Sequence, residues 1–150
     1  CYKTAKCVFD DMVNDVAKKF EECDGMVVGS PVYYASANGT LTAFLDRLVY
    51  STRFDKRMKV GASIAVARRG GCSATFDQLN KYFTISGMPL ASSQYWNSVH
   101  GAAIGEAVED LEGLQTMRTL ARNMVWMLRG LSQETLPVNE EPKLKTSFVR

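Results

Sequence analysis

The chain has 150 residues, of which 46% are hydrophobic, 23% charged and 10% aromatic, a composition typical of one soluble domain and unlike disordered, collagenous or membrane-spanning chains. Its 18 basic and 16 acidic residues give a formal charge of +2, so the overall charge does not favour a nucleic-acid or membrane partner. A single histidine, His100, excludes zinc sites that are built from several imidazoles. No signal peptide or membrane span is visible after Cys1, and we expect a cytoplasmic protein.

The first elements in the chain are a helix and a strand. Two aspartates precede apolar residues that recur at helical spacing, which predicts an amphipathic helix over residues 10–24. Residues 26–29 form an uninterrupted apolar run, which is typical of a strand covered on both faces in a parallel sheet. The Ser30-Pro31 step is expected to end that strand.

The same alternation continues to the end of the chain. The pattern predicts, in order, a helix over 41–48, a buried strand over 60–66, a helix over 75–83, a weak strand over 88–91, a long amphipathic helix over 111–128 and an extended tail over 131–150. Helices that alternate with apolar strands predict an α/β fold, a doubly wound parallel sheet, because each parallel pair of strands needs a helical crossover. Three strands leave edges and faces uncovered, so we expect the 1–150 chain to be the carboxyl three quarters of a single domain whose first strands precede Cys1.

Three loops follow the predicted strands, at the edge where open α/β sheets bind ligands. Residues 30–39 combine two tyrosines with small residues, which suits a flat ring. Residues 67–72 hold two glycines and two arginines, which provide an adaptable backbone and fixed positive charge. Residues 94–101 add two aromatic side chains and His100. Each loop also has a purely structural interpretation, but the expected convergence of all three on one edge favours a binding site.

The four cysteines are weighed separately. Cys1 and Cys7 form a Cys-x5-Cys pair, Cys23 lies near a helix end, and Cys72 lies beside the arginines. Two thiolates do not complete a four-ligand metal or cluster site, so free or structural thiols are favoured over the remnant of a longer motif. Disulfides are disfavoured if the protein is intracellular.

Several stretches match a known family residue by residue: 29–34, 39–47, 67–71, 76–80, 95–101 and 146–150. The most specific is Ser-Pro-Val-Tyr at 30–33, followed by Phe-Leu-Asp-Arg at 44–47. On these residues the chain resembles the flavodoxin-like NAD(P)H-dependent FMN reductase family, which is related to the iron-sulfur flavoproteins.

The resemblance implies an FMN site in the first two loops, with Tyr33 and Tyr34 beside the isoalloxazine ring. Backbone amides of the second loop, or Arg68, would stabilise the negative charge that develops on the pyrimidine side when the ring is reduced. The flavin itself would accept hydride from NAD(P)H and pass electrons to a quinone, a flavin or another small acceptor, so no side chain is required as acid, base or nucleophile. The residues expected to bind the cofactor are Ser30, Pro31, Val32, Tyr33, Tyr34, Asn38, Gly39, Ala67, Arg68, Arg69, Gly70 and Gly71.

Two departures from the family pattern occur at the amino end. The family's phosphate loop, typically Gly-Ser-Pro-Arg ending in Asn-Thr, does not precede Cys1. The family also often carries a Cys-x2-Cys-x2-Cys-x5-Cys run, of which Cys1 and Cys7 could be the last two members. In iron-sulfur flavoproteins these cysteines hold a four-iron, four-sulfur (4Fe-4S) cluster, whereas many relatives keep them without one, and free thiols are favoured here.

Other functions remain open from the sequence alone. One alternative is a flavodoxin-like electron carrier or a flavin-binding module without turnover of its own, although the +2 charge does not favour the acidic docking face of a carrier. Another is a nonenzymatic remnant that binds FMN weakly. The partners expected are a small-molecule electron acceptor and, from the resemblance, further copies of the chain in a homodimer or homotetramer.

Overall fold

The sheet at the centre of the molecule has its strands in the order β2-β1-β3-β4. The computed structural model describes residues 1, 3–132 and 141. The strands are β1 (Gly25–Tyr33), β2 (Ser36–Ala37), β3 (Val60–Ala67) and β4 (Ser98–His100). β1 pairs with β3 and β3 with β4 in parallel, and β2 turns back antiparallel to β1.

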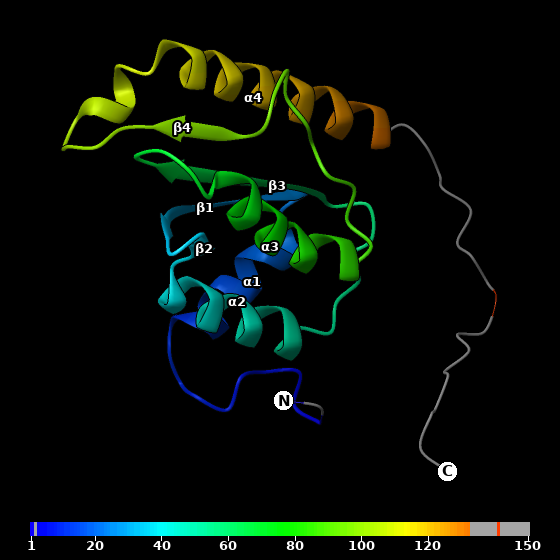
Figure 1. Cartoon of the computed structure of the whole chain (residues 1–150). Helices are drawn as coiled ribbons and strands as arrows, with labels where there is room; N and C mark the ends of the chain where they lie inside the picture. The colour runs from blue at the N-terminus through cyan, green and yellow to red at the C-terminus, as the bar shows by residue number, and fades with distance from the viewer. Residues whose placement is uncertain (2, 133–140, 142–150) are drawn as a thin grey trace.

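Helices cover both faces of this sheet (Figure 1). The helices are α1 (Met12–Glu22), α2 (Gly39–Ser51), α3 (Cys72–Ile85), the short 3-10 helix η1 (Glu106–Val108) and α4 (Leu111–Leu131). α1, α2 and α3 lie on one side and α4 on the other. The predicted α/β fold with a parallel, doubly wound sheet is therefore confirmed. The predicted single domain with further strands before it stays a prediction, and the expected tail falls outside the described residues beyond Ser132, apart from Glu141.

Each helical layer buries its own apolar cluster. Val13 of α1, Leu48 of α2 and Phe83 of α3 are almost completely buried between the three helices and the sheet. On the opposite face, Leu120 of α4 packs with Val60 of β3 and a set of methionines. The apolar residues at helical spacing therefore face the sheet, so each helical layer buries its apolar side against one face of it.

The strand predicted over 26–29 is longer and less covered than expected. It continues through the Ser30-Pro31 step as far as Tyr33, and Pro31 is in register with Val66 of β3. Proline is tolerated there because β1 is an edge strand from Gly25 to Pro31 within the described part of the chain. The predicted cover on both faces is also wrong for the middle of the strand, since Val27 is 50% exposed. α4 lies mainly over β3 and β4 and reaches β1 at Gly25, which Met124 approaches.

The predicted strand over 88–91 is wrong as well. That segment makes a single bridge, between Leu90 and Gly61 of β3, and Pro89 has no N–H with which to extend the ladder toward residue 88. The third parallel strand is β4, which lies inside the segment expected to be the third loop. Three residues suffice because Ser98 to His100 pair with the last residues of β3.

Among the described helices, none combines the length and apolarity that a membrane crossing requires.

The N-terminus of α1 is joined to α2 by an ion pair, and this pair gives the fold a testable dependence on acid. Asp11 caps α1 by accepting the N–H of Val13, and its carboxylate oxygens lie 2.6 Å from Nη2 of Arg47. The hydrogen bonds from Arg47, followed by the Val13 N–H, hold the pKa of Asp11 below its usual value. The ionised carboxylate therefore contributes stability that is fully present above the unfolded-state pKa of about 3.9 and is lost as the pH falls through the lower folded-state pKa.

We expect Asp11→Asn to reduce the loss of stability on acidification, because asparagine keeps the capping oxygen and removes only the titrating charge. The measurement is urea unfolding of both proteins at pH 7 and pH 3. The wild-type protein should lose more unfolding free energy between these two values than the variant does. An equal loss in both proteins would contradict the prediction.

Candidate functional site

The predicted site residues lie where β1 and β3 end. Ser30, Pro31, Val32 and Tyr33 belong to β1 itself, Tyr34 to the turn after it, Asn38 and Gly39 to the start of α2, and Ala67, Arg68, Arg69, Gly70 and Gly71 to the end of β3 and the following turn. Parallel strands bring their carboxyl ends to one edge of the sheet. The first two predicted loops therefore meet, as expected.

A tight hairpin turn presents the two tyrosines. Tyr34 and Ala35 both have positive φ, 52° and 57°, which is the backbone of a two-residue turn that usually needs Asn-Gly. Tyr34 is fully exposed and Tyr33 is 54% exposed. Strained backbone and exposed aromatic rings cost stability, and in proteins they are concentrated at binding sites. This turn is therefore a candidate contact surface for a flat ligand.

The base of the hairpin is held by polar groups that are satisfied inside the chain. The buried Ser30 hydroxyl accepts the N–H of Asn38 at 2.8 Å, and Oδ1 of Asn38 caps α2 by accepting the N–H groups of Thr40 and Leu41. Oε1 of Gln78 in α3 accepts the N–H of Ala37. Ser30 Oγ and Oδ1 of Asn38 thus orient the turn through hydrogen bonds within the protein.

The glycine turn after β3 packs directly against this hairpin. Gly71 has a φ of +92°, and a Cβ built there would lie 2.9 Å from Cα of Ala35 and 2.9 Å from Cγ1 of Val32. Only glycine permits both this backbone and this approach. Around Gly70, by contrast, a Cβ would meet no atom within 4 Å, so space is open beside the turn.

Positive charge borders the open side of the turn. Arg68 and Arg69 are exposed and form no hydrogen bond or ion pair with the described residues. α3 starts directly after Gly71, and no side chain in the described part of the chain caps its first N–H groups. The two guanidinium groups and these backbone donors favour a ligand that carries or gains negative charge at this edge.

The third predicted loop contains strand β4 and has residues beside the site both before and in that strand. Tyr95 and Trp96 come before β4 and not after it, and Trp96 packs on Phe76 of α3 with ring centroids 6.4 Å apart. Tyr95 and Trp96 line a small pocket together with His100. Phe76 in turn packs with Val32 and Ala67, so this loop lies next to the first two, as expected. His100 is the last residue of β4 and shares a shallow cavity of about 450 Å³, wide open to solvent, with Arg68 and Arg69.

Sequence reasoning missed Asp110, which lines the same cavity. Its only signal was an acidic residue just before an apolar helical pattern, and this is indistinguishable from an ordinary helix cap. Asp110 lies beside His100 because the segment that contains η1 brings the start of α4 back to the end of β4. The periodicity of neighbouring residues does not predict this path.

The family model described as NADPH-dependent FMN reductase matches residues 1–103. The chain belongs to this family. An iron-sulfur flavoprotein from Methanocaldococcus jannaschii is 31% identical over 137 residues, which cover 86% of this chain and 71% of the relative. One from Methanosarcina thermophila is 31% identical over 122 residues and covers 79% of this chain and 63% of the relative. This chain thus spans about two thirds of the length of these curated relatives.

Solved structures confirm the flavodoxin-like fold. RosB, solved with a bound riboflavin-5'-phosphate derivative, matches with a TM-score of 0.66 and 12% identity over 95% of this chain and 71% of that one. A flavodoxin from the domain Archaea matches with a TM-score of 0.52 and 14% identity, over 77% of this chain and 71% of that one. An apo NADH:FMN oxidoreductase matches with a TM-score of 0.57 and 18% identity, over 84% of this chain and 63% of that one.

The residues at this edge fit the isoalloxazine part of the FMN that defines the FMN reductase family. The fit rests on exposed tyrosine rings, open space beside Gly70, and arginines without partners among the described residues. A flat ring that becomes negatively charged on reduction needs these features.

The cysteines fit a 4Fe-4S cluster less well. Cys1 and Cys7 line a separate cavity of about 1320 Å³ between the N-terminal segment, α2 and α3. Sγ of Cys7 accepts a hydrogen bond from Nε of Arg47 at 3.3 Å, and this guanidinium lowers the pKa of the thiol. No group of three potential metal ligands occurs among the described residues, and two cysteines are half of the set that a cluster needs. No step is therefore derived through a cluster.

Proposed function

We propose that this protein is an FMN-dependent oxidoreductase that takes electrons from NAD(P)H and passes them to a quinone, a flavin or another small acceptor. The observation that carries the proposal is the contact between the tyrosine turn and the Gly70-Gly71 turn, with Arg68 and Arg69 at its rim. FMN, when bound, would supply the hydride and electron chemistry.

Each group at the edge has a distinct task in this proposal. The rings of Tyr33 and Tyr34 provide an aromatic surface for the isoalloxazine, and the glycine turn lets the backbone approach it. Arg68, Arg69 and the uncapped N–H groups of α3 stabilise the charge that reduction adds. Ser30 and Asn38 act indirectly, because their hydrogen bonds fix the conformation of the hairpin that presents the tyrosines.

FMN titration of the complete, flavin-free protein tests the proposal, with quenching of flavin fluorescence as the signal. We expect uptake of one FMN per chain, and we expect Tyr34→Ala to weaken binding about fivefold to tenfold, since an aromatic stack contributes on the order of 1 kcal/mol. Tyr50→Ala is the matched control, because Tyr50 is an exposed tyrosine of α2 outside the two turns. A complete protein that takes up no FMN would contradict the proposed function.

Steady-state oxidation of NADPH and NADH separates this enzyme from a flavodoxin-like electron carrier. The enzyme consumes the nicotinamide continuously once a quinone is added, whereas a carrier shows no turnover with any acceptor. An electron-transfer role is the second candidate function, because the curated relatives are named iron-sulfur flavoproteins. Iron and sulfide analysis of the complete protein belongs to the same experiment.

We also propose a homodimer or homotetramer. Support comes from large apolar side chains that α4 exposes, Leu111, Val125 and Trp126, because exposed apolar surface of this kind is typical of interfaces. Sedimentation of the complete protein measures the assembly.

A further inference from the structure

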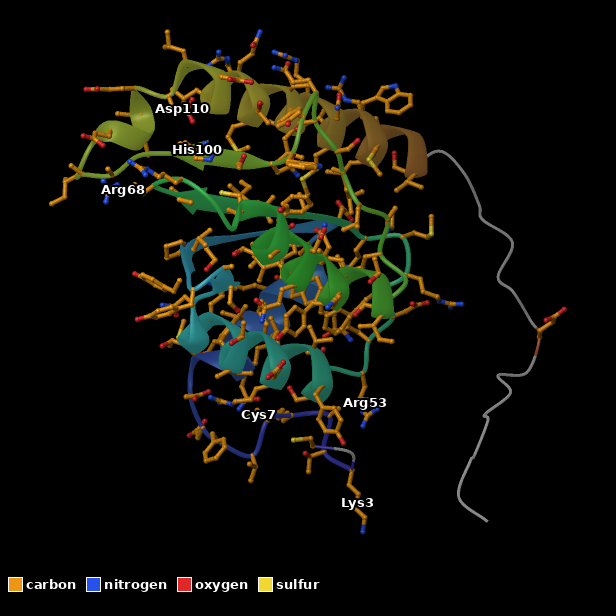
Figure 2. All side chains as sticks on the ribbon, viewed as in Figure 1. Lys3, Cys7, Arg53, Arg68, His100 and Asp110 are labelled. Atoms are coloured by element: carbon orange, nitrogen blue, oxygen red, sulfur yellow. The ribbon has the colours of Figure 1, made fainter. Side chains whose placement is uncertain are left out.

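Three side chains from three different elements meet at the carboxyl end of β4. Cys72 is the first residue of α3, His100 the last of β4, and Asp110 the N-cap of α4. Nε2 of His100 lies 3.9 Å from Sγ of Cys72, and Nδ1 lies 3.7 Å from Oδ2 of Asp110. Figure 2 shows His100 and Asp110 at the same end of the molecule as Arg68. The proposed function uses none of these three side chains.

Asp110 is held rigidly as a carboxylate. Its Oδ1 accepts the N–H of Gly113 at 2.9 Å, and its Oδ2 accepts the backbone N–H of His100 at 2.7 Å. These two hydrogen bonds, that of Gly113 first, hold the pKa of Asp110 below its usual value. A fixed anion beside Nδ1 favours the proton on that nitrogen and orients the imidazole ring.

The other ring nitrogen faces a group that stays neutral. Burial raises the pKa of the Cys72 thiol, so Nε2 of His100 has no thiolate beside it. The His100 side chain is 46% exposed, and it lines the cavity of about 450 Å³ that Arg68 and Arg69 also line. Of the two ring nitrogens, Nε2 is therefore the one without a charged partner among the described residues.

The remaining charges around this cavity come from the segment between β4 and α4. Glu106 and Glu109 line it as well. The Glu106 carboxylate accepts the backbone N–H groups of Ala102 and Ala103, which hold it away from the imidazole as part of the turn. Among the described residues, Asp110 is the carboxylate within ion-pair distance of the ring.

We propose that His100, oriented by Asp110, donates the proton to a carbonyl electron acceptor of the quinone class bound in the cavity that it shares with Arg68 and Arg69. This inference rests on the proposed function, because two-electron reduction of a quinone needs a hydride, and reduced flavin is its source. The quinone oxygen then takes one proton from the protonated imidazole: the Nε2–H bond breaks, an O–H bond forms, and the product is the hydroquinone. The ring keeps its Nδ1 proton toward Asp110 and regains the other from solvent.

In this scheme Asp110 is a positioning residue. The distances of 3.7 and 3.9 Å are those of a ligand-free site, in which catalytic hydrogen bonds are often long. A simpler alternative is that Asp110 only caps α4 and that His100 is a surface side chain without a role in proton transfer. The two readings differ in one respect: a purely structural histidine has no reason to distinguish acceptors that take protons from acceptors that do not.

The test is a comparison of two acceptors with the FMN-loaded complete protein, reduced anaerobically by dithionite and mixed in a stopped-flow instrument. Menadione takes two electrons and two protons, whereas ferricyanide takes electrons alone. For His100→Gln we expect reoxidation by menadione to slow about tenfold to a hundredfold. This factor is at or below the lower end of what general acids contribute to reaction rates, because water has access to the site and can also supply the proton. Reoxidation by ferricyanide should stay within about twofold of wild type.

Two variants complete the comparison. Asp110→Asn should slow the menadione reaction in the same direction by a smaller factor. Glu22→Gln, which removes a carboxylate from the last residue of α1, should leave both reactions unchanged. Equal menadione rates in wild type and His100→Gln would overturn the proposal. An equal loss with both acceptors would also overturn it, because it would indicate a structural role.

A second readout needs neither flavin nor turnover. Because the chain has one histidine, ¹⁵N spectra contain one pair of imidazole nitrogens. We expect the neutral ring to carry its proton on Nδ1 in the wild-type protein and to lose this preference in Asp110→Asn; a wild-type ring protonated on Nε2 would contradict the role of Asp110. If the protein takes up no FMN, both the proposed function and the quinone step are contradicted. If FMN uptake is normal and His100→Gln leaves the menadione rate unchanged, only the role of His100 is contradicted.

Discussion

Replacing Gly71 by alanine is expected to lower both the stability of the protein and its affinity for FMN. The φ of +92° costs a residue with a Cβ about 1–2 kcal/mol, and that Cβ would lie 2.9 Å from backbone and side-chain atoms of the tyrosine turn. The two turns must move apart, and this displaces the surface proposed for the isoalloxazine ring. We expect the FMN dissociation constant to rise at least about tenfold, because displacements near 1 Å at a site have effects of this size or larger.

Gly105 provides the control that separates strain from contact. It has nearly the same φ, +91°, but a Cβ there meets no atom within 4 Å. Gly105→Ala should therefore lose stability without losing FMN affinity. Urea unfolding and FMN titration of both variants measure the two quantities. If the two variants bound FMN equally well, the contact between the turns would have no part in cofactor binding.

Truncating Phe83 is expected to have the largest effect on stability. The side chain is 1% exposed and fills the cluster between α1, α2, α3 and the sheet. It lies so close to Gly61 of β3 that a Cβ built there would overlap its ring, and α3 therefore sits directly on the strand. Loss of a buried phenylalanine costs about 3–5 kcal/mol, a large part of the 5–15 kcal/mol that stabilises an ordinary domain.

Urea unfolding of Phe83→Ala measures this loss. Ile85→Ala is the control in the same helix, because Ile85 is 82% exposed and a surface substitution usually changes stability by less than about 0.5 kcal/mol. The free energy of unfolding should fall by several times more for Phe83→Ala than for the control. A loss below about 1.5 kcal/mol for Phe83→Ala would contradict the place of this side chain at the centre of the core.

The elements predicted well are those whose signal is local. The apolar residues of α4 recur every three or four positions, and Asp11 and Asn38 cap α1 and α2 through hydrogen bonds that span two or three residues. The composition of the turns after β1 and β3 is also visible in the sequence. Glycine, tyrosine and arginine at strand ends point to a flat anionic ligand, because each of these residues has a physical property that such a site needs.

The elements predicted wrongly depend on pairing between distant segments. β4 is three residues long, and its strand state comes from hydrogen bonds to the end of β3, whereas the apolar run around Pro89 has the better local pattern and makes a single bridge. Val27 looks like a buried strand residue, yet its exposure depends on which strands α4 covers.

The sequence alone determined the positions of β1, β3 and the four α-helices, the class of fold and the chemistry of the two turns, since helical and strand periodicities are properties of neighbouring residues. Only the tertiary structure decided which residues meet. The contact of Gly71 with Ala35 and the approach of Cys72, His100 and Asp110 join segments that lie 10 to 38 residues apart. Such contacts arise from strand pairing and helix packing, and these depend on the whole sheet and leave no periodic signal in the chain.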